Sequence, residues 1–197
     1  MPATSRTSPP SPLDRWLPKF HARTVHAQRA PVPPERLWEA AETVRVSDTR
    51  TLRPIIALRF GPYAPSPDTT FRELFRRAPF TLLEESQHSS VSGLAGRLWA
   101  LGDVFARLEG PGDYAAFADP GNAKVAVLNQ VRAHGRSGSE IVSEARVWCT
   151  DRSARLRFTP FWAVIGPFAI FIRLDLLPAA VARARSAPRP PPEASGQ

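Results

Sequence analysis

The sequence predicts an α+β fold in which a curved antiparallel sheet wraps around a long C-terminal helix. Residues 140–149 alternate between apolar and polar side chains, as a half-buried strand does. This strand ends at Thr150 and Asp151, and residues 158–172 then form a stretch of fifteen residues without a charge, closed by Arg173. Earlier in the chain, the sequence predicts a strand, two short helices and a run of strands, and this order completes the pattern.

The first predicted elements are a strand and two short helices. The side chains of residues 20–29 alternate between two faces, which is typical of a strand. Pro34 suits the first position of a helix, and residues 35–44 place apolar side chains on one helical face. A second short helix is expected at residues 54–60, and residues 71–77 predict one or two further helical turns.

The middle of the chain has the character of antiparallel strands. Residues 80–87 and 91–101 predict two strands joined by a short turn. Gly93 and Gly96 lie inside the second strand, where a missing side chain favours a bend or a bulge. Residues 102–119 fit either a short strand or a short helix.

The clearest hairpin precedes the final helix. Residues 123–134 and 139–150 are predicted to pair across a turn at residues 135–138. The final helix is expected to begin near Asp151, whose carboxylate suits a helix N-terminus. Pro167 follows Gly166 and lacks a backbone donor, so we expect a kink or a break there.

The distribution of proline predicts one folded domain between two extended tails. Eight of the 22 prolines lie in residues 1–34 and five lie in residues 178–197. The N-terminal segment has almost no apolar side chain to bury, so it is expected to stay solvated. We therefore expect disordered tails at residues 1–12 and 186–197. Residues 13–185 form the predicted domain, which is long enough to bury one substantial core.

The positive charge is too dispersed for a nucleic-acid surface. The net charge is +8, and 24 of the 26 basic residues are arginine, but the longest basic cluster between the tails is Arg76 and Arg77. A surface that recognises nucleic acid needs clustered cations, so no such partner is expected. Pro9, Pro10 and Pro12 interrupt the segment where a signal peptide would have its apolar core, which predicts a cytoplasmic location.

The cysteine and histidine content predicts neither a metal site nor a redox site. Cys149 is the single cysteine, and its place in a predicted strand favours a buried, inert thiol. The four histidines lack the i, i+4 spacing of a metal-binding pair. No Ser-His-Asp order, phosphate-binding glycine loop or dinucleotide fingerprint is present. We expect no metal and no cofactor, and the residues leave open whether the protein is an enzyme.

The apolar residues 158–172 have two interpretations. A helix that crosses a membrane needs about 20 apolar residues. This stretch is shorter, is flanked by Arg157 and Arg173, and contains Pro160 and Pro167. A helix buried in the core is therefore expected, and contact with a membrane is the alternative.

Several short strings along residues 13–185 resemble one known superfamily. They are Leu13-Asp-Arg-Trp-Leu-Pro18, Pro31-Val-Pro-Pro-Glu-Arg-Leu-Trp38, Gly93-Leu-Ala-Gly-Arg-Leu-Trp99, Ser143-Glu-Ala-Arg-Val147 and Phe161-Trp-Ala-Val-Ile165. Together with the order of elements they resemble the helix-grip superfamily, also called START-like, Bet v 1-like or SRPBCC, and within it an uncharacterised bacterial branch. The resemblance implies a cavity between sheet and C-terminal helix that holds a small apolar molecule. Some members are cyclases or hydrolases, but this branch has no catalytic signature to transfer.

Four residues are polar or aromatic candidates for the wall of such a cavity. Asn129 lies on the more apolar face of its strand, where a ligand, a water or a structural partner would satisfy its amide. Ser143 has the same two interpretations on the neighbouring strand. Arg97 shares a strand face with Trp99, and it would either anchor a carboxylate or cover the indole with its stem.

Three further candidates complete the predicted cavity wall. Glu84 and Glu85 point to opposite faces, and the strand register decides which of them faces inward. Glu85 is the candidate, and burial there would raise its pKa and make it a base. Phe161 and Trp162 are apolar wall candidates and also ordinary core residues. Seven residues therefore form the predicted ligand site: Glu85, Arg97, Trp99, Asn129, Ser143, Phe161 and Trp162.

Glu144 and Arg146 are two positions apart on a predicted strand and so share one face. Ile141, Ala145 and Val147 on the other face make the better core. We therefore interpret Glu144 and Arg146 as an exposed pair, which would contribute little to stability. A cavity role for the pair is the alternative.

Three functions remain compatible with the sequence. The first is binding of a small apolar molecule, lipid or polyketide-like, between sheet and helix without catalysis. The second is a cyclase or hydrolase of the same fold, which would need converging titratable residues, such as an unpaired Glu85 or His26 facing Arg97. The third is a membrane-associated protein that uses residues 158–172. The sequence has no signal for ligand identity, oligomeric state or pathway.

Overall fold

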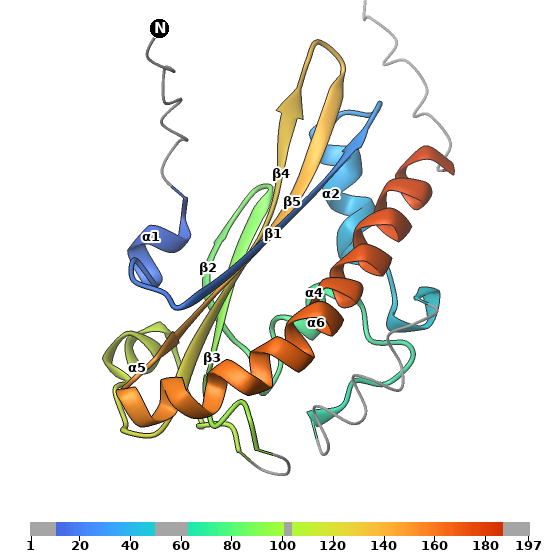
Figure 1. Ribbon diagram of the computed structural model, residues 1–197. Coiled ribbons are helices and arrows are strands. Elements are labelled where there is room, and N and C mark those ends of the chain that lie inside the picture. The colour runs from blue at the N-terminus through green and yellow to red at the C-terminus, as the bar shows by residue number, and fades with distance from the viewer. Residues whose placement is uncertain (1–10, 50–62, 101–103, 187–197) are drawn as a thin grey trace, which may run out of the picture.

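The computed structural model describes residues 11–49, 63–100 and 104–186, with the side chains of residues 165–174 left out. Within these ranges a five-stranded antiparallel sheet, in the order β1-β5-β4-β3-β2, lies against one long helix (Figure 1). The strands are β1 (Ala22–Ala30), β2 (Thr81–Ser86), β3 (Ser89–Gly96), β4 (Ala123–His134) and β5 (Gly138–Cys149). A sheet that grips a long helix is the arrangement that the sequence predicts, so the fold class is confirmed.

The helices include those predicted at residues 35–44 and 71–77. They are α1 (Leu13–Trp16), α2 (Pro34–Thr43), the 3-10 turn η1 (Val46–Asp48), α4 (Phe71–Leu74), α5 (Pro111–Ala116) and α6 (Arg152–Ser186). Of these, α1 and η1 were not predicted from the sequence. The ambiguous region at residues 102–119 contains the helix α5. The helix predicted at residues 54–60 lies outside the described residues. The domain boundaries at residues 13 and 185 stay a prediction.

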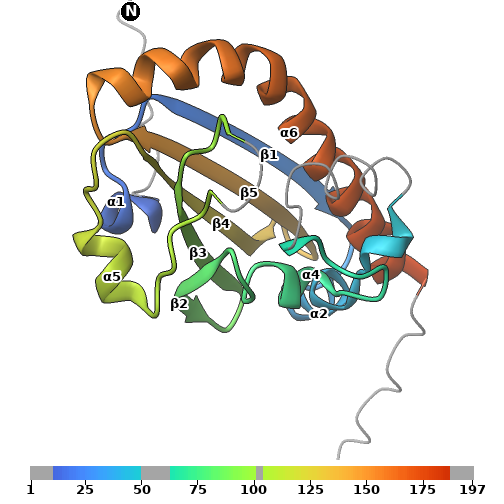
Figure 2. The ribbon, with the colours of Figure 1, turned by 90° about the horizontal axis from the view of Figure 1, so that it is seen from below.

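Helix α6 begins where the sequence predicts and continues for 35 residues. The backbone N–H of Ala154 donates to Oδ1 of Asp151 at 2.7 Å, which satisfies one free donor of the first turn. Of the kink or break expected at Pro167, the break is wrong, because the helix continues through this residue and arches over the sheet (Figure 2). Long helices often curve in this way around a core. No helix in the described part of the chain is long and apolar enough to cross a membrane.

The sheet has two covered faces. We call the face under α6 and α2 the inner face, and the face under α1 and α5 the outer face (Figures 1 and 2). Successive side chains of a strand alternate between the two faces. Leu13 and Leu17 from the α1 segment pack with Val91 and Leu128 on the outer face. Both faces of the sheet therefore hold buried side chains.

Two apolar clusters hold α6 against the inner face. At its start, Ala154 and Phe158 pack with Val147 and Cys149, in what we call the first α6 cluster. Near its end, the helix packs against α2 and the sheet in the second α6 cluster, whose largest members are Leu37, Trp38, Val44, Phe71, Val131, Ile141, Leu176, Leu177 and Val181. The middle of α6 therefore passes over the part of the sheet that lies between the two clusters.

Candidate functional site

A line of polar side chains crosses the inner face, with one residue from each strand. The register pairs His26 of β1 with Ser143 of β5, and pairs Ser143 with Asn129 of β4. It continues from Asn129 to Ser90 of β3, and from Ser90 to Glu85 of β2. Side chains directly opposite each other share a face and have Cβ atoms about 4.5–5.5 Å apart. We call these five residues the polar row.

The polar row lies between the two α6 clusters. Val131 and Ile141 of the second α6 cluster are register partners, one inner-face position away from Asn129 and Ser143. The first α6 cluster begins at Val147, two inner-face positions beyond Ser143. Polar side chains thus occupy the interval of the sheet that the middle of α6 crosses.

Asn129 is the buried centre of the polar row. Its side chain is 1% exposed, and its Oδ1 accepts a hydrogen bond from Oγ of Ser143 at 2.8 Å. Its Nδ2 is buried without a hydrogen-bond partner, and so is Oγ of Ser92, the next inner-face position of β3 after Ser90. A buried polar group left unsatisfied costs about 1–3 kcal/mol. The inner face therefore offers a donor amide and a hydroxyl to a guest molecule.

Glu85 closes the polar row at the edge of the sheet. A bulge between Leu82 and Glu84 sets the register that turns Glu85 to the inner face. The Glu85 carboxylate forms an ion pair with Arg76, and both side chains are partly exposed. Burial, assisted by the neighbouring Arg72 guanidinium, lowers the pKa of Arg76. Glu85 is thus held by a cation and is not a desolvated, unpaired base.

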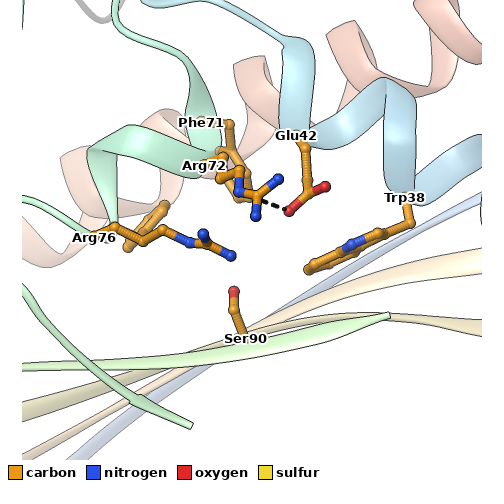
Figure 3. A pocket seen from close by; sticks show the side chains of 7 residues that line it. Trp38, Glu42, Phe71, Arg72, Arg76 and Ser90 are labelled. Carbon is orange, nitrogen blue, oxygen red and sulfur yellow. Dashed lines mark ion pairs between the residues drawn. The ribbon is translucent and has the colours of Figure 1, made fainter. Parts of the chain in front are cut away.

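A small pocket opens at this end of the polar row, between α2, the α4 segment and β3 (Figure 3). Its empty volume is about 250 Å³, part of it open to solvent. An ion pair between Nε of Arg72 and Oε1 of Glu42, at 3.5 Å, crosses its wall. Ser90 belongs to both the pocket and the polar row. The seven lining residues are Trp38, Glu42, Phe71, Arg72, Phe75, Arg76 and Ser90.

The structure separates the seven residues predicted from the sequence. Glu85, Asn129 and Ser143 lie together on the polar row. Trp99, Phe161 and Trp162 are half-buried and pack against the first α6 cluster, and Arg97 is exposed. The three aromatic residues thus lie beside core side chains, and Arg97 lies at the surface. None of the seven lines the described pocket.

The aromatic side chains at the start of α6 form a compact group. The ring of Phe158 lies 5.4 Å from that of Trp162 and 6.3 Å from that of Phe161, between centroids. Such contacts contribute to packing beyond the area they bury. This group supports the start of α6, and its role in a ligand site stays a prediction.

Sequence reasoning missed the residues that shape the pocket. Ser90 and Ser92 are two apart on a strand, so they share the inner face, and this spacing was the available signal. Arg72 and Arg76 are four apart, but α4 is only four residues long, so a helical face was a weak guide. Trp38 lies on the buried side of α2, where its position is that of an ordinary core residue.

The interpretation of Glu144 and Arg146 as an exposed pair is wrong. Each side chain is only 4% exposed, because α1 covers the outer face above them. Arg146 donates to Oε1 of Glu144 at 2.8 Å and to Oδ1 of Asp14 at 2.6 Å, and Arg23 donates to Glu144 at 2.8 Å. The pair faces away from the pocket, so it has no place in the inner-face site.

These contacts control the protonation of Glu144. Burial favours the neutral carboxyl, but the hydrogen bonds from Arg23 and Arg146 outweigh it and hold the pKa of Glu144 below its ordinary value. The carboxylate therefore stays charged in the folded protein. We call Asp14, Arg23, Glu144 and Arg146 the outer ionic network.

Cys149 is buried, as the sequence predicts. Its backbone N–H donates to Nδ1 of His21 at 3.0 Å. Burial raises the pKa of its thiol to about 11. The reactive thiolate is therefore scarce at neutral pH, and Cys149 acts as a core side chain.

The inner-face site can bind through hydrogen bonds and aromatic contact. The described residues include no group of three or more His, Cys, Asp or Glu side chains suited to a metal ion. The hydroxyl of Ser143 donates to Asn129, which is not a base. Arg97 is exposed and lies beyond the end of β3, so it does not face the polar row. The enzyme hypothesis needed Arg97 to face Glu85 or His26, which belong to that row.

The chain is similar to several solved structures at low sequence identity. No family model and no curated protein matches it. TTHA0849 from Thermus thermophilus has a TM-score of 0.34 and 11% identity, over 85% of this chain and 100% of that protein. Ara h 8.0201 has a TM-score of 0.38 and 13% identity, over 84% and 99%.

A third similar structure is the Zhui aromatase/cyclase from Streptomyces sp. R1128. It has a TM-score of 0.36 and 13% identity, over 84% of this chain and 96% of that protein. At these values the similarity indicates neither a ligand nor an activity for this chain.

Proposed function

We propose that the protein binds a small, largely apolar molecule that carries one polar group. The apolar part would lie against the aromatic side chains of the pocket, namely Trp38, Phe71 and Phe75. The polar group would lie at the polar row, which meets the pocket at Ser90. Binding sites of this kind are mostly apolar with a few placed polar groups that fix orientation.

The unsatisfied amide of Asn129 is the observation that carries this proposal. A side chain that is 1% exposed has no access to bulk water, and yet its Nδ2 has no partner. Replacement by an apolar residue would remove this cost, so its presence favours a role in binding. A carbonyl, ether or hydroxyl oxygen on the ligand would accept the free hydrogen bond.

The size of the pocket limits the ligand. Ligand pockets usually measure about 300–1,000 Å³, and the empty volume of about 250 Å³ here includes open solvent, so the described pocket does not enclose a ligand of that size. A bound molecule would therefore have to be small. Among the expected ligand classes, a small aromatic or polyketide-like molecule fits the pocket better than a whole lipid does.

Binding, and not catalysis, is the activity that the geometry supports best. A general base needs a group whose protonation is free to change near neutral pH. Glu85 is held by Arg76, and the hydroxyl of Ser143 is committed to Asn129. The enzyme alternative therefore lacks its expected acid–base pair on the inner face.

A matched pair of variants tests the role of the polar row. Asn129→Leu combined with Ser143→Ala removes both partners of a buried hydrogen bond, which is close to neutral for stability. Gln130→Leu changes the next residue of β4, on the outer face, and serves as the control. Affinity would be measured by titration with 2-naphthol, which has two fused rings and one hydroxyl, and stability by urea unfolding.

We expect the double variant to unfold at the wild-type urea concentration or above it and to bind 2-naphthol about tenfold more weakly. The control should bind like the wild type. An unchanged affinity in the double variant would contradict the proposed role of Asn129. Native mass spectrometry of the purified protein would then search for a co-purifying molecule of a different class.

A second pair of variants tests the placement of the ligand. Trp38 lines the pocket, and Trp99 packs at the first α6 cluster. Trp38→Leu should weaken binding of 2-naphthol, and Trp99→Leu should leave it unchanged. The reverse result would place the ligand beneath the start of α6, beside Phe161 and Trp162.

A further inference from the structure

The outward surface of the first turns of α6 has exposed apolar side chains in a row. Leu156 is 66% exposed and Val164 is 63% exposed, and both are among the large apolar side chains that the protein leaves in solvent. Pro160 and Ala163 are exposed between them. Single exposed apolar residues are ordinary, but these four follow the spacing of one helical face.

Arginines flank this apolar row, and no acidic residue accompanies them. Arg152, Arg155 and Arg157 are all exposed. The sequence contains no Asp or Glu from residue 152 to residue 174. Asp151, just before the helix, is engaged with the backbone of Ala154 and Gly121. Among the described side chains of residues 152–164, the exposed ones are arginines, apolar residues and the hydroxyl residues Ser153 and Thr159, and none carries a negative charge.

We propose that this face of α6, which we call the docking face, binds an anionic lipid surface. A helix with arginine on its polar flank and exposed apolar residues lies flat at a lipid interface, with its apolar side chains among the headgroups. Phosphate headgroups match the unbalanced charge of the three arginines, because an anionic leaflet attracts basic side chains near its surface.

The combination distinguishes a lipid surface from nucleic acid. Contacts to a phosphate backbone use cations and polar groups, and Leu156 and Val164 would gain nothing from them. The sheet covers the opposite side of this part of α6, where Ala154 and Phe158 are buried. The docking face is thus free to meet a flat surface without any change in the fold.

The docking face and the ligand pocket are separate features. The pocket lies at α2 and α4, whereas the docking face is the start of α6. The proposal therefore goes beyond ligand binding, and loss of lipid binding in a variant would leave the pocket residues unchanged. Titration with 2-naphthol provides the readout that separates the two.

Flotation with lipid vesicles tests the proposal. The full chain would be mixed with vesicles of phosphatidylcholine alone, or of equal parts phosphatidylcholine and phosphatidylglycerol. We expect it to float with the mixed vesicles only. Arg152→Gln combined with Arg157→Gln should weaken the partition by about 10- to 30-fold.

The matched control removes the same charge from the other end of the same helix. Arg183→Gln combined with Arg185→Gln also lowers the net charge by two, and Arg183 makes only a long, exposed ion pair with Asp48 at 3.8 Å. This control should bind the mixed vesicles nearly as the wild type does. Equal loss in both variants would show attraction by net charge alone and would overturn the proposal.

A third variant tests the apolar part of the docking face. Leu156→Ser combined with Val164→Ser should remove the fraction of bound protein that resists high salt, because salt screens the arginines but not apolar contact. Exposed substitutions of this kind usually change stability little, so the variant should fold. Absence of wild-type binding to the mixed vesicles, or unchanged salt resistance in this variant, would overturn the proposal.

Discussion

At the scale of single residues, Arg146 on the outer face and Asn129 on the inner face differ in how their polar groups are satisfied. On the outer face, Arg146 donates hydrogen bonds to Glu144, Asp14 and the carbonyl of Leu17. On the inner face, Asn129 keeps a free amide. The outer ionic network serves the fold, whereas the amide of Asn129 would be available to a ligand that reaches the polar row.

The outer ionic network gives a prediction for a single carboxylate. Glu144→Gln would leave Arg23 with no carboxylate partner on the sheet. Arg146 would keep Asp14 as its carboxylate partner. We expect the free energy of unfolding to fall by about 2 kcal/mol, below the loss for a fully unpaired buried charge. Urea unfolding at neutral pH measures it. Exposed Glu109→Gln is the control, and equal stability of the two variants would contradict the argument.

A close approach of backbone to an aromatic ring gives a second residue-scale prediction. A Cβ at Gly93 would lie 2.5 Å from two ring carbons of Tyr114 and 2.9 Å from Cδ1 of Leu83. Gly93→Ala should therefore destabilise the protein by about 1–3 kcal/mol through overpacking. Gly112→Ala is the matched control, because nothing lies within 4 Å of its added Cβ. Thermal unfolding of both variants distinguishes them, and a Gly93→Ala protein as stable as the control would refute this packing.

At the scale of elements, the start of α6 is fixed by one side chain. Asp151 accepts from the N–H groups of Ala154 and Gly121, so it caps the helix and ties it to the turn before β4. These backbone hydrogen bonds lower the pKa of Asp151. The same residue therefore positions the helix relative to the sheet that it crosses.

Two substitutions of Asp151 separate the effect of its hydrogen-bond acceptors from the effect of its charge. Asp151→Ala should lower the free energy of unfolding by about 1–2 kcal/mol, which is the usual range for a lost N-cap. Asp151→Asn keeps one acceptor oxygen and loses the charge, so its stability should lie between those of Asp151→Ala and the wild type. Urea unfolding measures both variants, and an Asp151→Ala protein with wild-type stability would contradict the capping role.

The strand pattern made the sheet predictable, but not its register. Sequence patterns located all five strands, and the turn before Gly138 located the hairpin. The strand predicted at residues 91–101 is too long, because β3 ends at Gly96, so Arg97 and Trp99 do not share a strand face.

The bulge between Leu82 and Glu84 decides which glutamate faces inward, and no local pattern in the sequence marks it. The alignment of His26 with Glu85 across five strands depends on every register at once, so sequence reasoning found its members only as separate candidates.

The error at Glu144 has a related cause. Alternation tells which residues share a face, but it does not tell whether both faces are covered. The four-residue helix α1 is too short to stand out as a covering element, and yet it buries the outer face. Charged residues on a covered face then need partners, and Arg23 and Asp14 supply them from distant parts of the chain.

At the scale of the whole molecule, acid should destabilise the fold. Burial lowers the pKa of His21. The pKa of Glu140 is lowered mainly by the hydrogen bond from Arg132, and the pKa of Asp14 is lowered mainly by the hydrogen bond from Arg146. Each group binds its proton more weakly in the folded than in the unfolded chain. Unfolding therefore takes up protons, and the free energy of unfolding rises with pH.

The sign and the pH window follow from the ordinary pKa values. The stabilisation is complete above about pH 6.5 for the histidine and above about pH 4.5 for the carboxyls, and it is lost as the pH falls below them. We expect the urea midpoint to fall slightly below about pH 6.5 and steeply below about pH 4.5. A midpoint that stays constant down to about pH 3 would contradict this account.

The two apolar clusters along α6 have a mechanical consequence. A helix that is packed near both ends bends most easily at its middle. The side chains that support α6 are Phe158 near one end and Leu176 with Leu177 near the other. Bending of the helix is therefore expected between these two supports, while the side chains of both clusters stay packed.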